Sequence, residues 1–329
     1  MIFSTASCNL NQPKSNDYIR QSLLDSLTKL EPTIGNISKQ IQSNPKNSEL
    51  YFARGSQFFH LNQLNLAAAD LHKAITLDST KIAYYLTFAD INIAAHYVPL
   101  AMEYLKRAER LAPQDRDLAL KLAKTFLYLK EYQAVMDETN KVLAVDQNNT
   151  KCFLLQGLVQ KEKGDTNRAI NTFKLAVDAD PDNYDAYMQL GLLNDFRNKK
   201  LAEKYLLNAI RIDSARYEGN YALAMHYQNN KDFKKAIARY KKMLLLDPQS
   251  AQPLYNIGCI YLQQDSLQKA FSNFNLAIAN APANADGYYM RGLCWEKRGN
   301  KNEAAKDYQT ALNIRRDFAE ATEAMKRVK

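Results

Sequence analysis

One spacing constrains the fold of this chain more than any other feature: small residues recur every 34 residues inside segments with helical periodicity. In residues 251–284, four residues share one helical face: Leu254, Ile257, Gly258 and Tyr261. A polar break follows, and a second helical face then runs to a proline. The pattern predicts two helices whose backbones approach closely, because Gly258 places no side chain at their contact.

Eight copies of this pattern follow one another, and the fifth is one residue shorter than the others. They start near Ser48, Ile82, Arg116, Thr150, Tyr184, Tyr217, Ala251 and Ala285. The position that demands a small residue reads Gly55, Ala89, Ala123, Gly157, Gly191, Ala224, Gly258 and Gly292. A helical unit of this kind cannot bury its apolar face alone, so the copies are expected to stack on one another.

These units resemble the tetratricopeptide repeat, which joins Leu-Gly and Tyr in a first helix to Ala, Phe and Ala in a second helix and to a closing Pro. The resemblance covers residues 48–318, and the whole chain is similar to bacterial tetratricopeptide repeat lipoproteins. It implies an all-α fold, namely a right-handed α-solenoid of about eight helix-turn-helix units with capping helices at both ends.

The sequence predicts four segments in this chain. They are a lipobox-like segment with a flexible tether at 1–16, capping helices at 17–47, the eight units at 48–318, and the end of a C-terminal capping helix at 319–329. Within the N-terminal caps, Pro32 and Gly35 are both expected to interrupt the helical pattern.

Cys8 is a candidate lipidation site. Thr5-Ala6-Ser7-Cys8 resembles the end of a bacterial lipoprotein signal peptide, and a polar stretch follows it as a tether. Only Met1, Ile2 and Phe3 supply an apolar region, and no Lys or Arg precedes them, so the alternative is a tail with a chance cysteine. We favour lipidation, which predicts an outer-membrane lipoprotein facing the periplasm; the alternative location is the cytoplasm.

No catalytic, cofactor or metal motif is present in the sequence. The four histidines have no carboxylate or cysteine partner at ligand spacing, and Cys152, Cys259 and Cys294 fall within helical patterns as small core residues. The pattern therefore predicts no enzyme, no cofactor and no metal. The net charge of +9 is spread along the sequence, so no nucleic-acid partner is expected.

An apolar stripe on the first helices is the candidate partner-binding groove. In tetratricopeptide arrays these helices line the inner face, and one stripe lies beside the packing positions. The predicted groove residues are Phe52, Leu86, Leu120, Leu154, Met188, Tyr221, Tyr255 and Tyr289, with Met225 and Leu293 in a second row. Two interpretations stay open: an exposed groove for a peptide, or a stripe partly buried between helices.

The resulting prediction is a non-enzymatic scaffold that binds partner proteins or peptides in its groove. First-turn acids such as Glu49, Asp185 and Asp286 complement the helix dipole; if they also rim the groove, they favour a basic partner. Two alternatives stay open, a cytoplasmic adaptor or co-chaperone without an anchor and, as a less favoured reading, a basic solenoid associated with nucleic acid.

Overall fold

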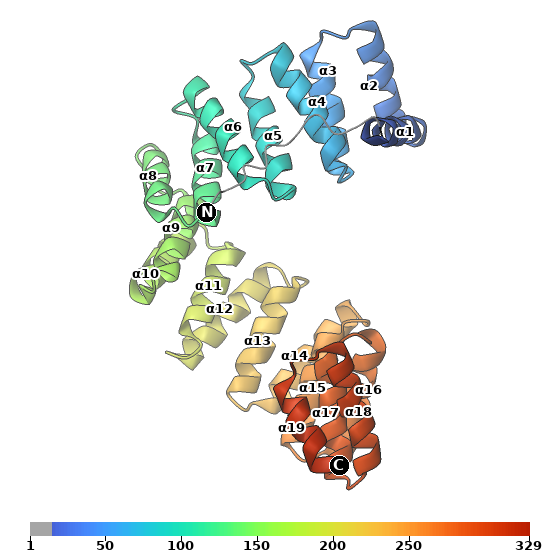
Figure 1. Cartoon of the computed structure of the whole chain (residues 1–329). Coiled ribbons are helices and arrows are strands. Elements are labelled where there is room, and N and C mark those ends of the chain that lie inside the picture. The colour runs from blue at the N-terminus through green and yellow to red at the C-terminus, as the bar shows by residue number, and fades with distance from the viewer. Residues whose placement is uncertain (1–14) are drawn as a thin grey trace, which may run out of the picture. The chain divides into compact units, whose positions relative to one another are not determined.

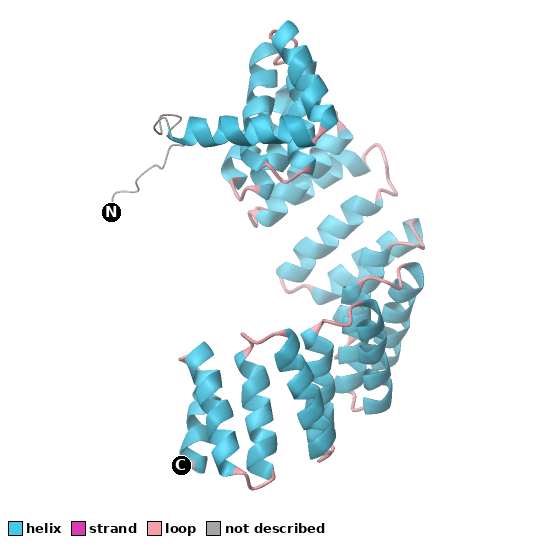
Figure 2. Ribbon diagram, turned by 90° about the vertical axis from the view of Figure 1, so that its right-hand side faces the viewer, coloured by secondary structure: helices cyan, strands magenta, loops and turns pink. Residues whose placement is uncertain are grey.

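The protein is built from α-helices. The structure, a computed structural model, describes residues 15–329, and every regular element in that range is helical (Figure 1). The helices follow one another in pairs joined by short turns (Figure 2). None of the described helices combines the length and apolar character that crossing a membrane requires. The predicted all-α fold of helix-turn-helix units is therefore confirmed.

The chain divides into two compact units, Met1–Val159 and Gln160–Lys329, and the boundary lies within helix α9 (Thr150–Glu162). The helices of the first compact unit before α9 are α1 (Ser15–Leu30), α2 (Pro32–Ser43), α3 (Ser48–His60), α4 (Leu64–Leu77), α5 (Ile82–Ala94), α6 (Val98–Leu111), α7 (Arg116–Tyr128) and α8 (Tyr132–Leu143).

The second compact unit contains the end of α9 and ten further helices. They are α10 (Thr166–Ala179), α11 (Tyr184–Asn194), α12 (Lys199–Ile212), α13 (Tyr217–Asn229), α14 (Phe233–Leu246), α15 (Ala251–Gln263), α16 (Leu267–Asn280), α17 (Ala285–Lys297), α18 (Lys301–Ile314) and α19 (Ala319–Val328). The odd-numbered helices from α3 to α17 begin at the residues where the sequence pattern places the eight starts.

Asparagine and aspartate residues set several of these helix starts. The side chains of Asn47, Asp115, Asn183 and Asn284 accept hydrogen bonds from backbone N–H groups in the first turns of α3, α7, α11 and α17. Such a cap satisfies one of the N–H groups that a helix leaves without a partner at its start. Each capping residue immediately precedes its helix, so these four caps help to fix where the repeats begin.

The small residues allow the two helices of a pair to pack closely. A Cβ atom added at Gly258 would lie 2.6 Å from a ring carbon of Phe274, and one added at Gly292 would lie 2.6 Å from a ring carbon of Tyr308. The paired small residues of the second helices are fully buried: Ala67, Ala101, Val135, Ala169, Ala202, Ala236, Ala270 and Ala304. The close approach of the two helices therefore determines the residue size at both positions, in the first helix and in the second, as the sequence pattern predicts.

Seven of the eight turns between paired helices contain one residue in the left-handed region. These residues are Asn62, His96, Lys130, Gly164, Lys231, Asp265 and Gly299. The fifth unit lacks such a residue, and α11 has 11 residues where α13 has 13. The one-residue deletion therefore lies in the turn between α11 and α12, which leaves that turn irregular.

The N-terminal helices α1 and α2 cross closely. Pro32 is the first residue of α2, where its missing N–H costs no hydrogen bond. Gly35 lies inside α2 and is buried, so the prediction that it interrupts the helix is wrong. A Cβ atom at Gly35 would lie 2.7 Å from the Thr28 carbonyl oxygen, which shows that this glycine permits the crossing.

Helix α19 covers the last helix pair. Its buried face consists of Ala321, Ala324, Met325 and Val328, which follow the buried Phe318. Arg327 extends from this helix to Glu296 of α17 and donates from Nε at 2.9 Å and from Nη2 at 3.0 Å. The apolar face that α18 would otherwise expose is thereby buried, as a terminal capping helix requires.

Candidate partner-binding surface

The ten predicted groove residues lie on the first helices of their pairs, and most are half-buried. Met188 is buried at 7% exposure. The half-buried residues are Phe52, Leu86, Leu120, Leu154, Tyr221, Met225, Tyr255, Tyr289 and Leu293. Each of them contributes one side to packing and leaves another at the surface. Their role in partner binding stays a prediction.

The three tyrosines each lie against an aromatic ring of the second helix. The ring centroids are 6.3 Å apart for Tyr221 and Tyr240 and 5.8 Å apart for Tyr255 and Phe274. Tyr289 lies 5.8 Å from Tyr308 in α18 and 5.0 Å from Phe318. Contacts of this kind stabilise the helix pair, so alanine at these positions removes packing as well as surface.

Burial also changes the acidity of the groups in this stripe. It raises the pKa of the Tyr255 hydroxyl above its usual range, and the neighbouring Cys259 acts in the same direction. Burial raises the pKa of the Cys259 thiol to about 11. Both groups therefore remain protonated at neutral pH, and the Tyr255 hydroxyl keeps a proton that it can donate to a backbone carbonyl.

The second row, which lies four residues further along each first helix, changes character along the chain. It is polar in the first three repeats, with Ser56, Asp90 and Lys124, and apolar in the last five, with Leu158, Leu192, Met225, Cys259 and Leu293. In the first compact unit, Lys121 Nζ also lies 2.5 Å from Asp90 Oδ2. The stripe therefore broadens into an apolar surface in the second compact unit, where Leu192 is 45% exposed.

Three of the first-turn acids form ion pairs with basic residues that precede the next first helix. The distances are 3.4 Å for Glu49 and Lys81, 3.3 Å for Asp185 and Arg216, and 2.8 Å for Asp286 and Arg315. These acids connect successive repeats, and their charge is already partly balanced. A basic partner is therefore attracted less strongly than the isolated carboxylates imply.

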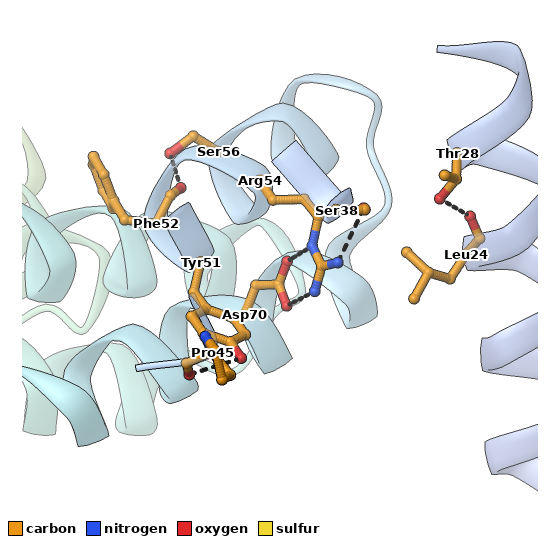
Figure 3. A network of polar contacts seen from close by, with 9 residues as sticks. All are labelled: Leu24, Thr28, Ser38, Pro45, Tyr51, Phe52, Arg54, Ser56 and Asp70. Carbon is orange, nitrogen blue, oxygen red and sulfur yellow. Dashed lines mark hydrogen bonds and ion pairs between the residues drawn. The ribbon is translucent and has the colours of Figure 1, made fainter. Parts of the chain in front are cut away.

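A buried ion pair joins the two helices of the first repeat, and a hydrogen bond from the same arginine reaches the helix before it (Figure 3). Arg54 of α3 donates from Nε at 2.7 Å and from Nη2 at 2.9 Å to the carboxylate of Asp70, and from Nη1 at 3.1 Å to Ser38. The pattern recurs in the last repeat, where Arg291 binds Asp307 and Asn275. In both repeats the acid and the third partner lie 16 residues from the arginine along the chain.

Comparison with known families agrees with this geometry. Family models described as tetratricopeptide repeat match residues 154–216, 221–285 and 285–318. The chain is a tetratricopeptide repeat protein. The helix pairs in residues 48–153 have the same spacing and the same buried small residues as the matched repeats.

Relatives of this repeat protein vary in size and kind. The chain is 22% identical over 249 residues to BBSome complex member BBS4 of Bos taurus, a match that covers 65% of this chain and 48% of that protein. The chain thus spans about half the length of this curated relative. It is 29% identical over 145 residues to protein O-mannosyl-transferase Tmtc3 of Drosophila melanogaster, covering 44% of this chain and 16% of that protein.

A solved bacterial structure shows the same fold. The C-terminal part of a TPR repeat-containing protein from Cytophaga hutchinsonii matches with a TM-score of 0.60 and 19% identity. The match covers 74% of this chain and 99% of that one. At this level of identity the likeness shows the fold alone.

One polar contact between repeats was not foreseen from the sequence. His226 of α13 is buried at 4% exposure, and its Nδ1 contacts Oδ1 of Asp195 in the turn after α11. The sequence analysis considered only partners at metal-ligand spacing, so it did not find this pair. Asp195 and His226 are 31 residues apart, so only an alignment of the two repeats against each other reveals that they meet.

The cysteines are the remaining side chains that could be reactive, and three of them lie in the part of the chain that the structure describes. Cys152 and Cys294 are buried, Cys259 is half-buried, and all three are free thiols. Among the side chains that the structure describes, those of His, Cys, Asp and Glu form no group that has the geometry of a metal site. Cys8, the predicted lipidation site, lies outside the described residues.

Proposed function

We propose that this tetratricopeptide repeat protein is a non-enzymatic scaffold that binds an extended or helical segment of a partner protein on the first helices of its second compact unit. The observation that carries the proposal is the widened apolar stripe. There, the half-buried tyrosines stand beside a second row made of Leu192, Met225, Cys259 and Leu293. Such a surface offers apolar contact together with hydroxyl groups for the backbone of the bound segment.

The non-enzymatic part of the proposal rests on the fold and on the site. The tetratricopeptide repeat is a protein-interaction module, and the polar groups of the candidate surface are used in packing and ion pairs between helices. The relative named as a transferase matches over only 16% of its own length. The activity in that name therefore carries no weight for this chain.

Photo-crosslinking in the native host tests the surface directly. A photoreactive phenylalanine analogue placed at Leu192 and, separately, at Tyr289 is expected to trap the same partner. The control position is Leu276 of α16, which is 55% exposed but belongs to a second helix. Adducts at Leu276 in the absence of adducts at Leu192 and Tyr289 would place the partner on the other helices and refute the proposed surface.

We further propose that the protein is anchored by a lipid at Cys8 in the bacterial outer membrane, facing the periplasm, as part of an envelope assembly. The support is the Thr5-Ala6-Ser7-Cys8 pattern with its polar tether. Labelled palmitate is expected to enter the wild-type protein and not the Cys8→Ser variant. Equal labelling of both proteins, or of neither, would favour the cytoplasmic adaptor.

A further inference from the structure

The irregular turn between α11 and α12 exposes an aromatic side chain among basic residues. Helix α11 ends at Asn194, and the short turn places Phe196 in solvent at 88% exposure, the highest value among the large apolar side chains that the structure describes. Arg197, Lys199 and Lys200 follow it, and all three are exposed. An isolated exposed apolar residue is common, so the surroundings of Phe196 decide whether it has a role.

Two contacts hold this turn in place from both sides. Asp195 contacts the buried His226 of α13, and Arg197 Nη2 donates to Asn167 Oδ1 of α10 at 2.6 Å. The residues on either side of Phe196 are therefore tied to the neighbouring repeats. Its ring is presented to solvent by an anchored turn, and binding does not have to pay for ordering that backbone.

The following turn adds basic residues beside this one. Lys235 at the start of α14 lies 3.2 Å from Glu203 of α12, which connects the starts of the two second helices. Lys231 and Lys234 lie in and just after the turn between α13 and α14, and both are exposed. The Phe196 patch is defined here as Phe196, Arg197, Lys199, Lys200, Lys231 and Lys234.

The charge around the Phe196 patch is net positive. Six positive charges, on Arg197, Lys199, Lys200, Lys231, Lys234 and Lys235, stand against three negative charges on Asp195, Glu203 and Asp232. The four lysines of the patch form no ion pair with any side chain that the structure describes. A positive field therefore surrounds the exposed ring.

We propose that the Phe196 patch docks on an anionic lipid surface. Its partner has to supply an apolar environment for the ring and negative charge for the lysines at one place. An anionic bilayer interface offers both without a pre-shaped pocket, because the ring inserts among the acyl chains while the lysines remain at the headgroups. An acidic protein would need a dedicated apolar pocket bordered by carboxylates to match a ring that protrudes so far.

This contact is separate from the stripe on the first helices and goes beyond the scaffold function. It would hold the second compact unit at a membrane surface through its own residues, whether or not a lipid is attached at Cys8. A single weak membrane signal is reversible, and a second signal in the same chain strengthens the attachment.

Vesicle co-sedimentation of the full-length Cys8→Ser protein tests the proposal without an acyl chain. The protein is expected to sediment with vesicles of phosphatidylcholine mixed with phosphatidylglycerol, and not with phosphatidylcholine alone. Each lysine of the patch changed to glutamine is expected to weaken binding about fivefold. Phe196→Ser is expected to weaken it roughly tenfold, and added salt should lower the affinity of the wild-type protein.

Matched controls come from the first compact unit. Tyr128 is 66% exposed and lies 12 residues after the start of its repeat, as Phe196 does. Tyr128→Ser and the pair Lys46→Gln and Lys73→Gln are expected to leave vesicle binding unchanged. Equal binding to both kinds of vesicle, or equal loss with the control variants, overturns the proposal. Binding of polyglutamate through the patch without vesicle binding would assign it to an acidic protein instead.

Discussion

The first and the last repeat use the same buried ion pair, but their surroundings differ. Arg54 and Asp70 are 11% and 8% exposed, whereas Arg291 and Asp307 are 23% and 8% exposed. The third partner is Ser38 of α2 in the first repeat and Asn275 of α16 in the last. Helix α2 therefore occupies the place of a repeat's second helix.

The glycine beside each arginine faces a different neighbour. A Cβ atom at Gly55 would lie 2.2 Å from a terminal methyl carbon of Leu71, and one at Gly292 would lie 2.6 Å from a ring carbon of Tyr308. The Tyr308 hydroxyl also donates to Glu296 at 2.5 Å. In the last repeat, the Tyr308 ring that packs against the glycine is also held by its hydroxyl group. In the first repeat, the aliphatic Leu71 side chain packs against the glycine and can change rotamer.

Breaking the buried ion pair should produce the largest effect. Arg54→Met leaves the Asp70 carboxylate buried without its partner and is expected to lower the free energy of unfolding by about 3–5 kcal/mol. Arg291→Met should cost less, because Arg291 is more exposed and water can reach its site. Urea unfolding measures both changes, with hydrogen exchange to assign each loss to its repeat.

A double variant separates the contribution of the ion pair to stability from the contribution of the residues around it. Arg54→Met combined with Asp70→Leu removes both charges and is expected to recover most of the stability lost in the single variant. If the double variant is as unstable as Arg54→Met alone, the contact with Ser38 or the shape of the site matters more than the ion pair.

Replacing the buried glycines by alanine should have an intermediate effect on the free energy of unfolding. Gly292→Ala is expected to destabilise by about 1–3 kcal/mol, because the Tyr308 ring cannot move aside without losing its hydrogen bond. Gly55→Ala should cost less, since the Leu71 methyl group is more adaptable and alanine favours the helix. Thermal unfolding compares the stability of the two variants. Adding Tyr308→Leu to Gly292→Ala should reduce the difference between the stability losses at the two glycine positions. An equal loss at both positions would contradict the distinction between ring and methyl group.

The smallest effect on stability is a dependence on pH at the contact between α17 and α19 in the last repeat. The hydrogen bonds from Arg327 and Tyr308 lower the pKa of Glu296 in the folded protein. A lowered folded pKa contributes stability above the unfolded value of about 4.3, and this contribution is lost as the pH falls through the folded value. The first repeat has Phe59 at the equivalent position, five residues after its arginine.

Local hydrogen exchange at pH 7 and at about pH 3 tests this difference, because the stabilisation is lost below the ordinary glutamate pKa of about 4.3. Protection in α17 and α19 should fall with pH in the wild-type protein and change less in Glu296→Gln. The change in α3 serves as the internal control. A fall of the same size in Glu296→Gln would show that another acid is responsible.

Much of the fold could be predicted because its determinants are local and periodic. Gly258 and Ala270 mark the close helix contact, and the same pattern phases all eight helix pairs. The groove residues were placed on the correct helices for the same reason. Their half-burial could not be predicted, because it depends on how far each neighbouring repeat covers Tyr221, Tyr255 and Tyr289.

The contacts that the sequence could not predict are mainly those between repeats. Asp195 and His226 lie 31 residues apart, and Ser38 lies 16 residues before Arg54, so no local motif connects them. The repeat period also affects where basic residues gather. Lys199 and Lys234 are spread along the sequence, yet both lie at the starts of second helices in successive repeats, α12 and α14.

The sequence by itself determined the helices, their phase and the family, because the small residue at each helix contact and the caps before several first helices act within one repeat. The tertiary structure decided which residues meet across repeats: Arg54 with Ser38, Arg291 with Asn275, and Asp195 with His226. It also decided that Phe196 is exposed. These depend on the stacking of neighbouring repeats, which brings together side chains that no spacing within a single repeat connects.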